Sequence, residues 1–195
     1  MGEKLLKAKL RKKLLAQRER LGKKFVQASS RRVCARLVAA REFRKAKNIL
    51  FYYPVKNEVN CLAAMRKGLE MGKRVFLPRI RKWDFQIVEV KKLPELEKMG
   101  ARKGTFGVPE PSGKRAPLGK IELVVVPAVA FDRRGGRIGY GGGYYDELLG
   151  KKEFKGVSIG ACYSKFLFGE LPSEGHDKRV DYIVCEEKVI TCKRK

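Results

Sequence analysis

A glycine-rich segment from residue 135 to residue 146 holds the side chains best suited to chemistry. It reads Gly-Gly-Arg-Ile-Gly-Tyr-Gly-Gly-Gly-Tyr-Tyr-Asp, and six of the chain's 20 glycines lie in its first nine positions. Because glycine has no Cβ, backbone N–H groups here can close on a ligand, and a following helix N-terminus adds partial positive charge. Arg137, Tyr140 and Asp146 add a cation, an aromatic face and a candidate metal ligand. The segment predicts a phosphate-binding loop.

This segment does not match the common nucleotide-binding fingerprints. It lacks the Gly-Lys-Ser/Thr ending of a P-loop and the G-x-G-x-x-G spacing of dinucleotide-binding folds. One alternative is that the glycines only form a tight connection between a strand and a helix. Arg133, Arg134 and Arg137 argue against that alternative, because a plain connection does not require three cations.

A second candidate for anion binding lies near the N-terminus. From Glu3 to Leu21, leucines recur at helical spacing among Lys and Arg, which predicts an amphipathic basic helix ended by Gly22. Lys7 and Arg11 are four residues apart, so they project from one face and can reach one anion together. The alternative is an ordinary solvated basic face.

Two buried strands are expected to position these residues. Residues 123–127 form an apolar run ahead of the glycine segment, and residues 144–149 predict the helix that follows it. Residues 49–53 predict another buried strand, ended by Pro54. Open α/β sheets bind ligands at the C-terminal ends of their strands, and Glu58 is the only acid in the polar loop at that end.

The remaining pattern predicts an α/β fold. The expected elements are a second helix from about Phe25 to Arg44, a helix over 62–71, and strands over 74–78, 85–90, 157–163, 181–185 and 189–192. A strand, a helix and a strand within about thirty residues are typical of a parallel crossover. We therefore expect one domain over residues 1–195, with three α/β/α layers, a mostly parallel sheet and two preceding N-terminal helices.

Residues 91–120 predict a long loop, because prolines and glycines interrupt this stretch throughout. A connection of this length inside a compact domain is usually functional or disordered. Phe106 lies between rigid turns and is a candidate wall for a flat ligand. The alternative is that Phe106 only pins the loop to the core.

Composition favours a globular protein of the cytoplasm. The chain is 44% apolar but has no run of about eighteen apolar residues and no secretory signal. Its five cysteines include no C-x-x-C pair, which argues against a disulfide framework or a zinc site. We expect each cysteine to be a small buried apolar residue.

The formal charge of +25 attracts polyanions but does not identify a partner. The 46 Lys and Arg are spread along the chain with 21 acids among them, whereas nucleic-acid proteins more often concentrate basic and aromatic residues on one face. Abundant Lys, Arg and Glu are also typical of thermophile proteins. We expect a monomer that acts on small molecules, with no nucleic-acid or membrane partner.

Several segments together resemble the 5-formyltetrahydrofolate cyclo-ligase family, also called methenyltetrahydrofolate synthetases. Residues 137–146 are similar to the family's arginine–aliphatic–glycine–x–glycine–x–glycine–Tyr–Tyr–Asp signature without a break. Residues 7–11 are similar to its Lys-x-x-Leu-Arg opening, and residues 57–59, 106–111 and 176–181 fall in the family's order. The similarity covers nearly the whole chain.

The resemblance implies an ATP- and Mg²⁺-dependent ligase. Such an enzyme converts 5-formyltetrahydrofolate, which is also used in polyglutamylated form, to 5,10-methenyltetrahydrofolate and releases ADP and phosphate. The formyl oxygen is a poor leaving group, so its phosphorylation precedes ring closure by N10. Phosphoryl transfer depends mainly on positioning and charge neutralisation.

The resemblance also implies site residues. ATP contacts fall on Lys7, Arg11, Arg137, Ile138, Gly139, Tyr140, Gly141, Gly142, Gly143, Tyr144 and Tyr145. Folate contacts fall on Tyr53, Glu58, Phe106, Tyr140 and Tyr144. Magnesium ligands fall on Asp146 and Asp181, and the catalytic residues are Arg137 and Tyr144. The basic N-terminal helix must fold back to the glycine segment for these assignments to form one site.

Two other functions stay open at this point. Another ATP-using or sugar-phosphate enzyme can share the same layered fold. A basic nucleic-acid-binding protein is favoured by charge alone, without a supporting motif.

Overall fold

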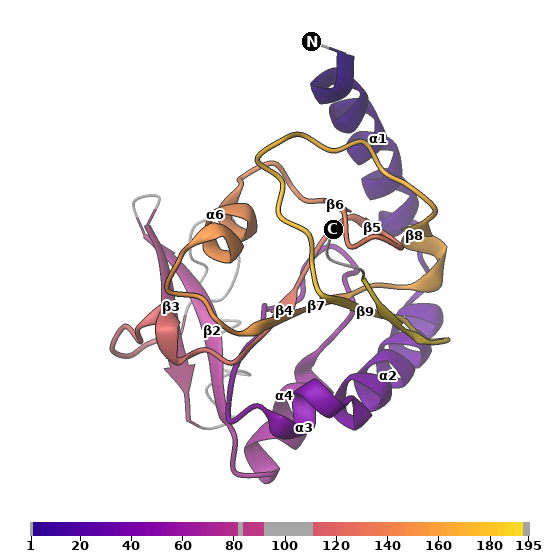
Figure 1. Cartoon of the computed structure of the whole chain (residues 1–195). Helices are drawn as coiled ribbons and strands as arrows, with labels where there is room; N and C mark the ends of the chain where they lie inside the picture. Colours follow the sequence, from indigo (N-terminus) through magenta and orange to yellow (C-terminus); the bar gives the residue numbers. More distant parts are fainter. Residues whose placement is uncertain (1, 82–83, 92–110, 193–195) are drawn as a thin grey trace.

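Seven strands form the central sheet of the computed structural model, which describes residues 2–81, 84–91 and 111–192 (Figure 1). In spatial order the strands are β10 (Val189–Thr191), β9 (Tyr182–Val184), β7 (Val157–Ala161), β4 (Leu123–Val126), β1 (Asn48–Leu50), β2 (Arg74–Arg81) and β3 (Asp84–Val90). The five inner strands pair in parallel, and both edge strands are antiparallel to their neighbours. The prediction of a mostly parallel sheet is confirmed.

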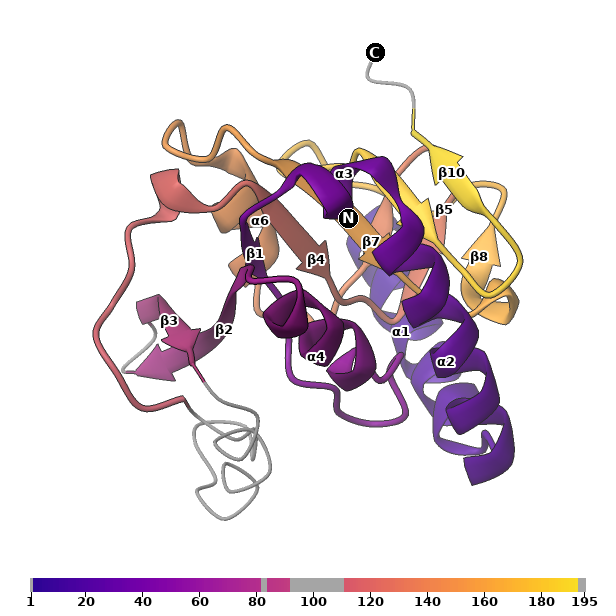
Figure 2. The same ribbon diagram turned by 90° about the horizontal axis from the view of Figure 1, so that it is seen from below.

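Helices cover both faces of this sheet. Figures 1 and 2 show α2 (Lys23–Ala39), α3 (Arg41–Lys45) and α4 (Leu62–Glu70) on one face and α6 (Tyr144–Gly150) on the other. Side chains along β4 alternate between two apolar cores, with Leu123 and Val125 facing the α2 and α4 side and Val124 and Val126 facing α6. Such double burial explains why β4 reads as continuous Leu-Val-Val-Val. The expected three-layer arrangement is present.

The parallel crossover is also confirmed. β1 and β2 pair in parallel and are joined through α4. The Asn60 side chain accepts a hydrogen bond from the Leu62 N–H at the start of α4. At its end Gly72, with φ of 72°, takes the left-handed conformation typical of a helix C-terminus.

The second predicted helix is divided in two. α2 ends at Ala39, and Ala40 takes an extended conformation before the short α3. This break turns Phe43 into the core, where its ring lies edge-on to Phe51 with 6.3 Å between centroids. Burial of the aromatic ring outweighs the continuous helical pattern of the sequence.

The strand predicted over residues 49–53 is shorter than expected. β1 ends at Leu50, although the Phe51 N–H still bonds to the Phe76 carbonyl at 2.8 Å. Tyr52 then leaves the ladder and donates its hydroxyl to the Val59 carbonyl at 2.8 Å. That bond closes the loop that carries Glu58.

The glycine-rich segment is not one continuous loop, which corrects the sequence interpretation. β5 (Ala130–Asp132) and β6 (Arg137–Ile138), which lie between β4 and α6 in the chain, form a second sheet with β8 (Leu167–Phe168), in the order β6-β5-β8. Gly135 and Gly136 belong to the tight β5–β6 turn. In this turn the N–H groups of Arg134 and Gly136 donate hydrogen bonds to Asp132 Oδ1. Only residues 139–143 connect β6 to α6.

The β5–β6 turn gives a first prediction. Gly135 has φ of +87°, and a Cβ there would lie 2.4 Å from the Val180 carbonyl oxygen. We expect Gly135→Ala to lower the free energy of unfolding by roughly 2–4 kcal/mol, through backbone strain and overpacking. Urea unfolding measures the change.

Gly169→Ala is the matched control, because a Cβ at Gly169 meets nothing within 4 Å. Its free energy of unfolding should stay within about 0.5 kcal/mol of the wild type, as for most exposed substitutions. Equal stability of the two variants would contradict the steric assignment of Gly135.

The cysteine prediction is confirmed, since all five cysteines are free and buried. Among the described residues, no helix has the length and apolar character needed to span a membrane.

Candidate active site

A cavity of about 420 Å³ lies between α1 (Gly2–Glu19), the loop after β6 and the segment from residue 171 to residue 180. Arg11 joins two of these walls, because its Nε donates to the Gly139 carbonyl at 2.7 Å. The N-terminal helix therefore folds back to the glycine loop, as the family resemblance requires. The cavity is lined by Lys4, Lys7, Ala8, Arg11, Pro127, Arg137, Gly139, Tyr140, Gly141, Gly142, Gly143, Tyr144, Tyr145, Asp146, Glu174, His176 and Asp177.

One face of α1 supplies its contacts to the rest of the protein. Lys7, Arg11, Leu14 and Arg18 are spaced by four, three and four residues, so they share a face of the helix. Lys7, Leu14 and Arg18 are buried and Leu10 and Leu15 are half-buried, while the other leucines and lysines of the helix are exposed. The solvated-face alternative for Lys7 is wrong, because this side chain is only 6% exposed.

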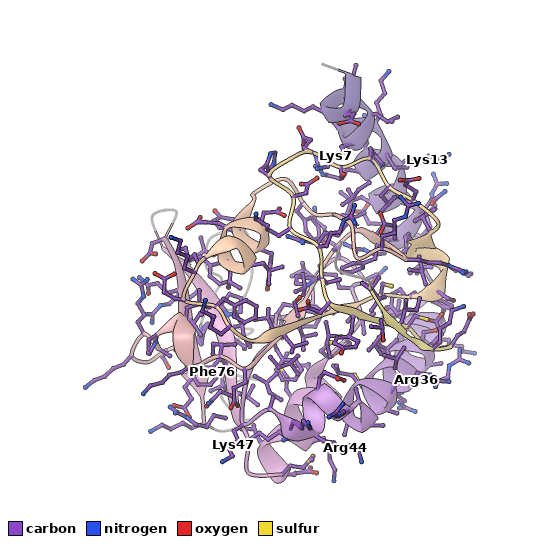
Figure 3. All side chains as sticks on the ribbon, viewed as in Figure 1. Lys7, Lys13, Arg36, Arg44, Lys47 and Phe76 are labelled. Atoms are coloured by element: carbon purple, nitrogen blue, oxygen red, sulfur yellow. The ribbon has the colours of Figure 1, made fainter. Side chains whose placement is uncertain are left out.

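Lys7 is held by two acidic side chains. Its Nζ lies 2.9 and 2.7 Å from the two carboxylate oxygens of Asp177, and 3.1 Å from Glu174 Oε2. Partial burial raises the pKa of Asp177, but the Lys7 ammonium and the Glu174 N–H outweigh it and leave that pKa lowered. Figure 3 shows Lys7 beside the 171–180 segment, whereas Lys13 lies on the outer side of α1.

Asp177 and Glu174 had no predicted role. Together with His176 they form a group whose ligand atoms lie within 4.8 Å of one another. The only signal in the sequence was the position of His176-Asp177 in the family pattern, because the 167 to 170 residues that separate these acids from Lys7 hide the contact.

Arg137 and Asp146 form a partly buried ion pair. The Arg137 Nη2 lies 2.8 Å from Asp146 Oδ1, and Arg137 Nη1 donates to the Lys178 carbonyl. The Lys178 N–H also donates to Asp146 Oδ1, at 2.9 Å. Burial lowers the pKa of the Arg137 guanidinium, and the Asp146 carboxylate opposes this shift. The pair fixes the first turn of α6 against β6.

Tyrosines form the apolar part of the wall. The Tyr144 ring lies over Gly142, where a Cβ would be 2.8 Å from Cε2 of the ring. Phe85 packs against both Tyr144 and Tyr145. The Tyr145 hydroxyl is buried and has no hydrogen-bond partner among the described residues. A ligand atom at this oxygen would satisfy it.

Glu58 and Tyr140 connect this cavity to the loop after β1. Glu58 is 5% exposed, with Oε2 accepting from the Val55 N–H at 3.0 Å and Oε1 unpartnered among the described residues. Burial raises the pKa of Glu58 to about 7, against the opposing effects of Arg18, the Val55 amide and the Tyr140 hydroxyl. Glu58 in turn helps to raise the pKa of Tyr145, after burial, so the carboxyl group is electrostatically close to the cavity.

Sequence reasoning missed Arg18. Its guanidinium donates to the Tyr140 hydroxyl and stacks over the Tyr140 ring, 5.4 Å from the centroid. The available signal was its spacing of seven residues from Arg11, which places both on one face of the predicted helix.

Of the predicted residues that the structure describes, four do not line this cavity. Glu58 lines a separate small hollow of about 10 Å³, together with Arg18 and Ala128. Ile138 is buried in the core, and half-buried Tyr53 does not line the cavity. Asp181 lines a separate hollow of about 480 Å³, and its Oδ2 accepts from the Ser158 N–H and hydroxyl at 2.9 and 2.8 Å. Phe106 lies outside the described residues.

Comparison with known proteins agrees with the resemblance noted in the sequence. The model of the 5-formyltetrahydrofolate cyclo-ligase family matches residues 3–186. The probable 5-formyltetrahydrofolate cyclo-ligase of Schizosaccharomyces pombe is 29% identical over 203 residues, which cover 95% of this chain and 98% of the relative. The 5-formyltetrahydrofolate cyclo-ligase of Haemophilus influenzae is 30% identical over 141 residues, which cover 70% of this chain and 74% of the relative.

A solved structure supports the same assignment. The NMR structure of Aquifex aeolicus 5,10-methenyltetrahydrofolate synthetase is 34% identical and has a TM-score of 0.83, with 97% of this chain and 94% of that chain covered. The chain therefore belongs to the 5-formyltetrahydrofolate cyclo-ligase family of ligases.

Proposed function

We propose that this protein uses ATP and Mg²⁺ to convert 5-formyltetrahydrofolate, free or polyglutamylated, to 5,10-methenyltetrahydrofolate, with release of ADP and phosphate. The observation that carries the proposal is the convergence of Lys7, Arg11 and Arg137 on the glycine loop around one cavity. Three cations beside exposed backbone N–H groups suit a triphosphate. The family and the relatives' names support the folate substrate.

The phosphate side of the site consists of residues 139–143 with the three cations. Arg11 is tied to the Gly139 carbonyl through Nε, so its remaining guanidinium donors are available to a phosphate oxygen. Phosphoryl transfer needs positioning and charge neutralisation more than a covalent nucleophile. In this proposal Arg137 stabilises charge on the transferred phosphoryl group, and Tyr144 positions the reacting groups beside the loop.

Asp146 fits a magnesium ion. Both hydrogen bonds that described residues make to its carboxylate end on Oδ1, which leaves Oδ2 as a hard oxygen ligand at the cavity. The ion would neutralise phosphate charge when bound. Asp181 is held by Ser158 outside the cavity, so the arrangement supports Asp146 over Asp181 for this role.

The folate side is proposed around Glu58. Its Oε1 is a buried acceptor without a partner among the described residues, which suits the amino and ring N–H donors of a pterin. Tyr140 and Tyr144 both line the cavity, which supports a proposed role for their rings in stacking on a flat ligand. Roles for Tyr53 and Phe106 stay predictions.

The proposed reaction has two steps. The formyl oxygen attacks the γ-phosphorus of ATP, so an O–P bond forms, the bond to the leaving ADP breaks, and an iminium-like phosphorylated intermediate results. N10 then attacks the formyl carbon, the C–O bond breaks, and the N10 proton leaves with the departing phosphate. Exclusion of water by the tyrosine wall protects this intermediate from hydrolysis.

A direct assay tests the proposal. Protein, MgATP and 5-formyltetrahydrofolate are mixed, and the near-ultraviolet absorbance of the methenyl product is followed. We expect product to form only when both substrates and Mg²⁺ are present. No product from a folded sample would reject the proposed function.

Lys7 gives a second prediction. Replacement of Lys7 by methionine removes a cation but keeps an unbranched apolar stem, so we expect the KM for ATP to rise roughly tenfold, about the free energy of one charged hydrogen bond. Steady-state kinetics with varied ATP measure the change.

Lys9→Met is the matched control for Lys7, because Lys9 is exposed on the same helix and does not line the cavity. Its KM for ATP should equal that of the wild type. A KM increase shared by both variants would show that the overall charge of α1, and not the position of Lys7, attracts ATP.

We also propose a cytoplasmic location, because five buried free thiols fit a reducing compartment. The monomeric state and the absence of nucleic-acid and membrane partners stay predictions. Saturable RNA or DNA binding at physiological salt, without folate turnover, would favour the nucleic-acid alternative.

A further inference from the structure

Arg18 connects three separate segments through one side chain. It lies in the last turn of α1 and is 3% exposed. Its Nε donates to the Lys56 carbonyl at 3.0 Å and its Nη1 to the Ala128 carbonyl at 2.7 Å, while Nη2 donates to the Tyr140 hydroxyl. A planar guanidinium can serve three acceptors in fixed directions, which an ammonium cannot do.

The connected segments belong to both halves of the proposed site. Lys56 precedes Glu58 in the loop on the folate side. Ala128 follows β4, and Tyr140 lies within the glycine loop on the ATP side. The same helix face also carries Lys7 and Arg11 to the phosphate side. The Arg18 guanidinium therefore links the position of α1 and of the glycine loop to that of the Glu58 loop.

The contact between α1 and the Glu58 loop is reciprocal. The Asn57 side-chain nitrogen donates to the Arg18 carbonyl at 3.1 Å and to the Glu19 carbonyl at 3.3 Å, so it satisfies the end of the helix. Lys56 and Asn57 have φ of 45° and 55°, a left-handed backbone conformation that residues other than glycine rarely adopt. Such backbone persists only where surrounding contacts hold it.

A role as a simple structural anchor leaves part of this arrangement unexplained. A buried guanidinium bonded only to neutral oxygens carries a desolvation cost, and an apolar side chain would fill the same space without it. The nearby acid is Glu58, whose ionised form Arg18 favours. Besides Arg18, the groups that interact electrostatically with Glu58 are Tyr52, Cys61, Tyr140 and Tyr145. Arg18 is the only cation in this group of interacting residues.

We propose that Arg18 is a positioning residue that holds Glu58 and the glycine loop at Tyr140 in one fixed relation, so that ATP and folate each bind more tightly when the other is present. This inference rests on the proposed function, because it assigns the two segments to the two substrates. Ordering one segment lowers the cost of ordering the other, which couples the two affinities.

Binding measurements test this coupling. The Kd of 5-formyltetrahydrofolate is measured by titration calorimetry with and without a non-hydrolysable ATP analogue and Mg²⁺. Couplings of this kind change affinity by roughly 5- to 150-fold, so we expect the wild type to fall in that range. In Arg18→Met and Arg18→Lys the ratio of the two Kd values should fall towards one, because neither side chain can bind all three acceptors.

Arg20→Met is the matched control, because Arg20 is exposed directly after the last residue of α1 and lies outside the cavity. It should keep the wild-type ratio. Tyr140→Phe removes only the hydroxyl that Arg18 binds and keeps the ring, so we expect an intermediate ratio. If thermal unfolding shows that both Arg18 variants are unfolded, the ratio of Kd values in Tyr140→Phe tests the proposal instead.

Several outcomes would overturn the proposal: no coupling in the wild type, a wild-type ratio in a folded Arg18 variant, or an unchanged ratio in Tyr140→Phe. The turnover assay is independent of these results. If the wild type forms product but shows no coupling between the two ligands, only the proposed role of Arg18 is rejected. If the wild type binds both ligands with coupling but forms no product, only the proposed reaction is rejected.

Discussion

Replacement of Arg137 by alanine is expected to slow turnover by roughly 10²- to 10³-fold, the usual effect of removing one donor that stabilises transition-state charge. Arg137 lies at the cavity and is only 7% exposed, so its guanidinium is held in place. Its loss also leaves Asp146 without the 2.8 Å ion pair, so the first turn of α6 loses its orientation. The rate constant at saturating substrates measures the effect.

The same variant should be less stable. Because Arg137 bonds to Asp146 and to the Lys178 carbonyl, we expect its loss to lower the free energy of unfolding by about 1–3 kcal/mol, as for a hydrogen bond to a charged group. Asp146→Asn keeps the volume of the side chain and should also slow turnover severely, with a smaller loss of stability. Activity is therefore compared below the unfolding temperature of each variant.

Arg134→Ala is the matched control, because Arg134 lies on the same β5–β6 turn with an exposed ion pair to Glu170. Its rate and stability should stay near those of the wild type, since exposed pairs contribute about 1 kcal/mol or less. Wild-type rates in both Arg137→Ala and Asp146→Asn would show that the phosphate side of the site is assigned to the wrong residues.

Replacement of Glu58 by glutamine is expected to raise the KM for 5-formyltetrahydrofolate by roughly 10²-fold or more at pH 8, because a site built to accept hydrogen bonds discriminates strongly when a partner is lost. The carboxylate can accept from two pterin donors, whereas glutamine offers one acceptor and one competing donor. The KM for ATP should change much less. Initial rates with varied folate at saturating ATP give the first KM, and initial rates with varied ATP at saturating folate give the second.

The pKa of Glu58 predicts how this effect depends on pH. Burial raises that pKa to about 7, so the wild-type carboxyl group becomes protonated below this pH. The wild-type KM for folate should therefore rise as pH falls from 8 to 6 and approach the KM of Glu58→Gln. A constant ratio of the two KM values across this range would contradict the role of the ionised carboxylate.

Stability should respond to the same group. In the unfolded chain Glu58 has the ordinary glutamate pKa of 4.5, whereas burial in the folded chain raises this pKa to about 7. The stabilising effect of the neutral form is fully present below pH 4.5 and is lost as pH rises through 7, by about 3 kcal/mol in total. Urea unfolding from pH 5 to pH 8 should show this slope in the wild type and lose it in Glu58→Gln.

Glu70→Gln serves as the control for both Glu58 experiments. Glu70 is an exposed acid on α4 that pairs with Lys67 on the surface. Its folate KM and its pH slope should match those of the wild type. If Glu70→Gln flattened the slope equally, the titrating group would not be Glu58.

Several features of this protein follow from local sequence alone. Alternating and continuous apolar runs predicted the strands of the sheet, because a strand buried on both faces leaves no polar position. The helix face with Lys7 and Arg11 followed from a spacing of four residues, and the position of Glu58 at the end of a strand followed from the polarity switch after Pro54. The glycine signature identified the family, because several specific residues fall in one short segment.

Other predictions failed because they depended on distant contacts. The continuous glycine loop was wrong since β5 and β6 pair across Gly135 and Gly136, and that pairing requires Asp132 and the Val180 backbone to meet the turn. The long second helix was wrong since burial of Phe43 breaks it at Ala40. The free energy gained from the β5–β6 pairing and from burial of Phe43 depends on distant residues, so no local sequence pattern predicts it.

The arrangement of the site also depended on tertiary structure. Sequence alone determined which side chains have suitable chemistry, and it placed Arg11 and the glycine segment as candidates for one phosphate. Only the folded chain decided that Lys7 meets Asp177 across 170 residues, that Asp181 bonds to Ser158 away from the cavity, and that Arg18 joins the Glu58 loop to Tyr140. Spacing along a helix or a strand fixes only which residues share a face. What that face contacts is set by the packing of elements that are remote in sequence. This packing brings α1 and the Glu58 loop to the glycine loop, so the candidate site is built from three separate segments.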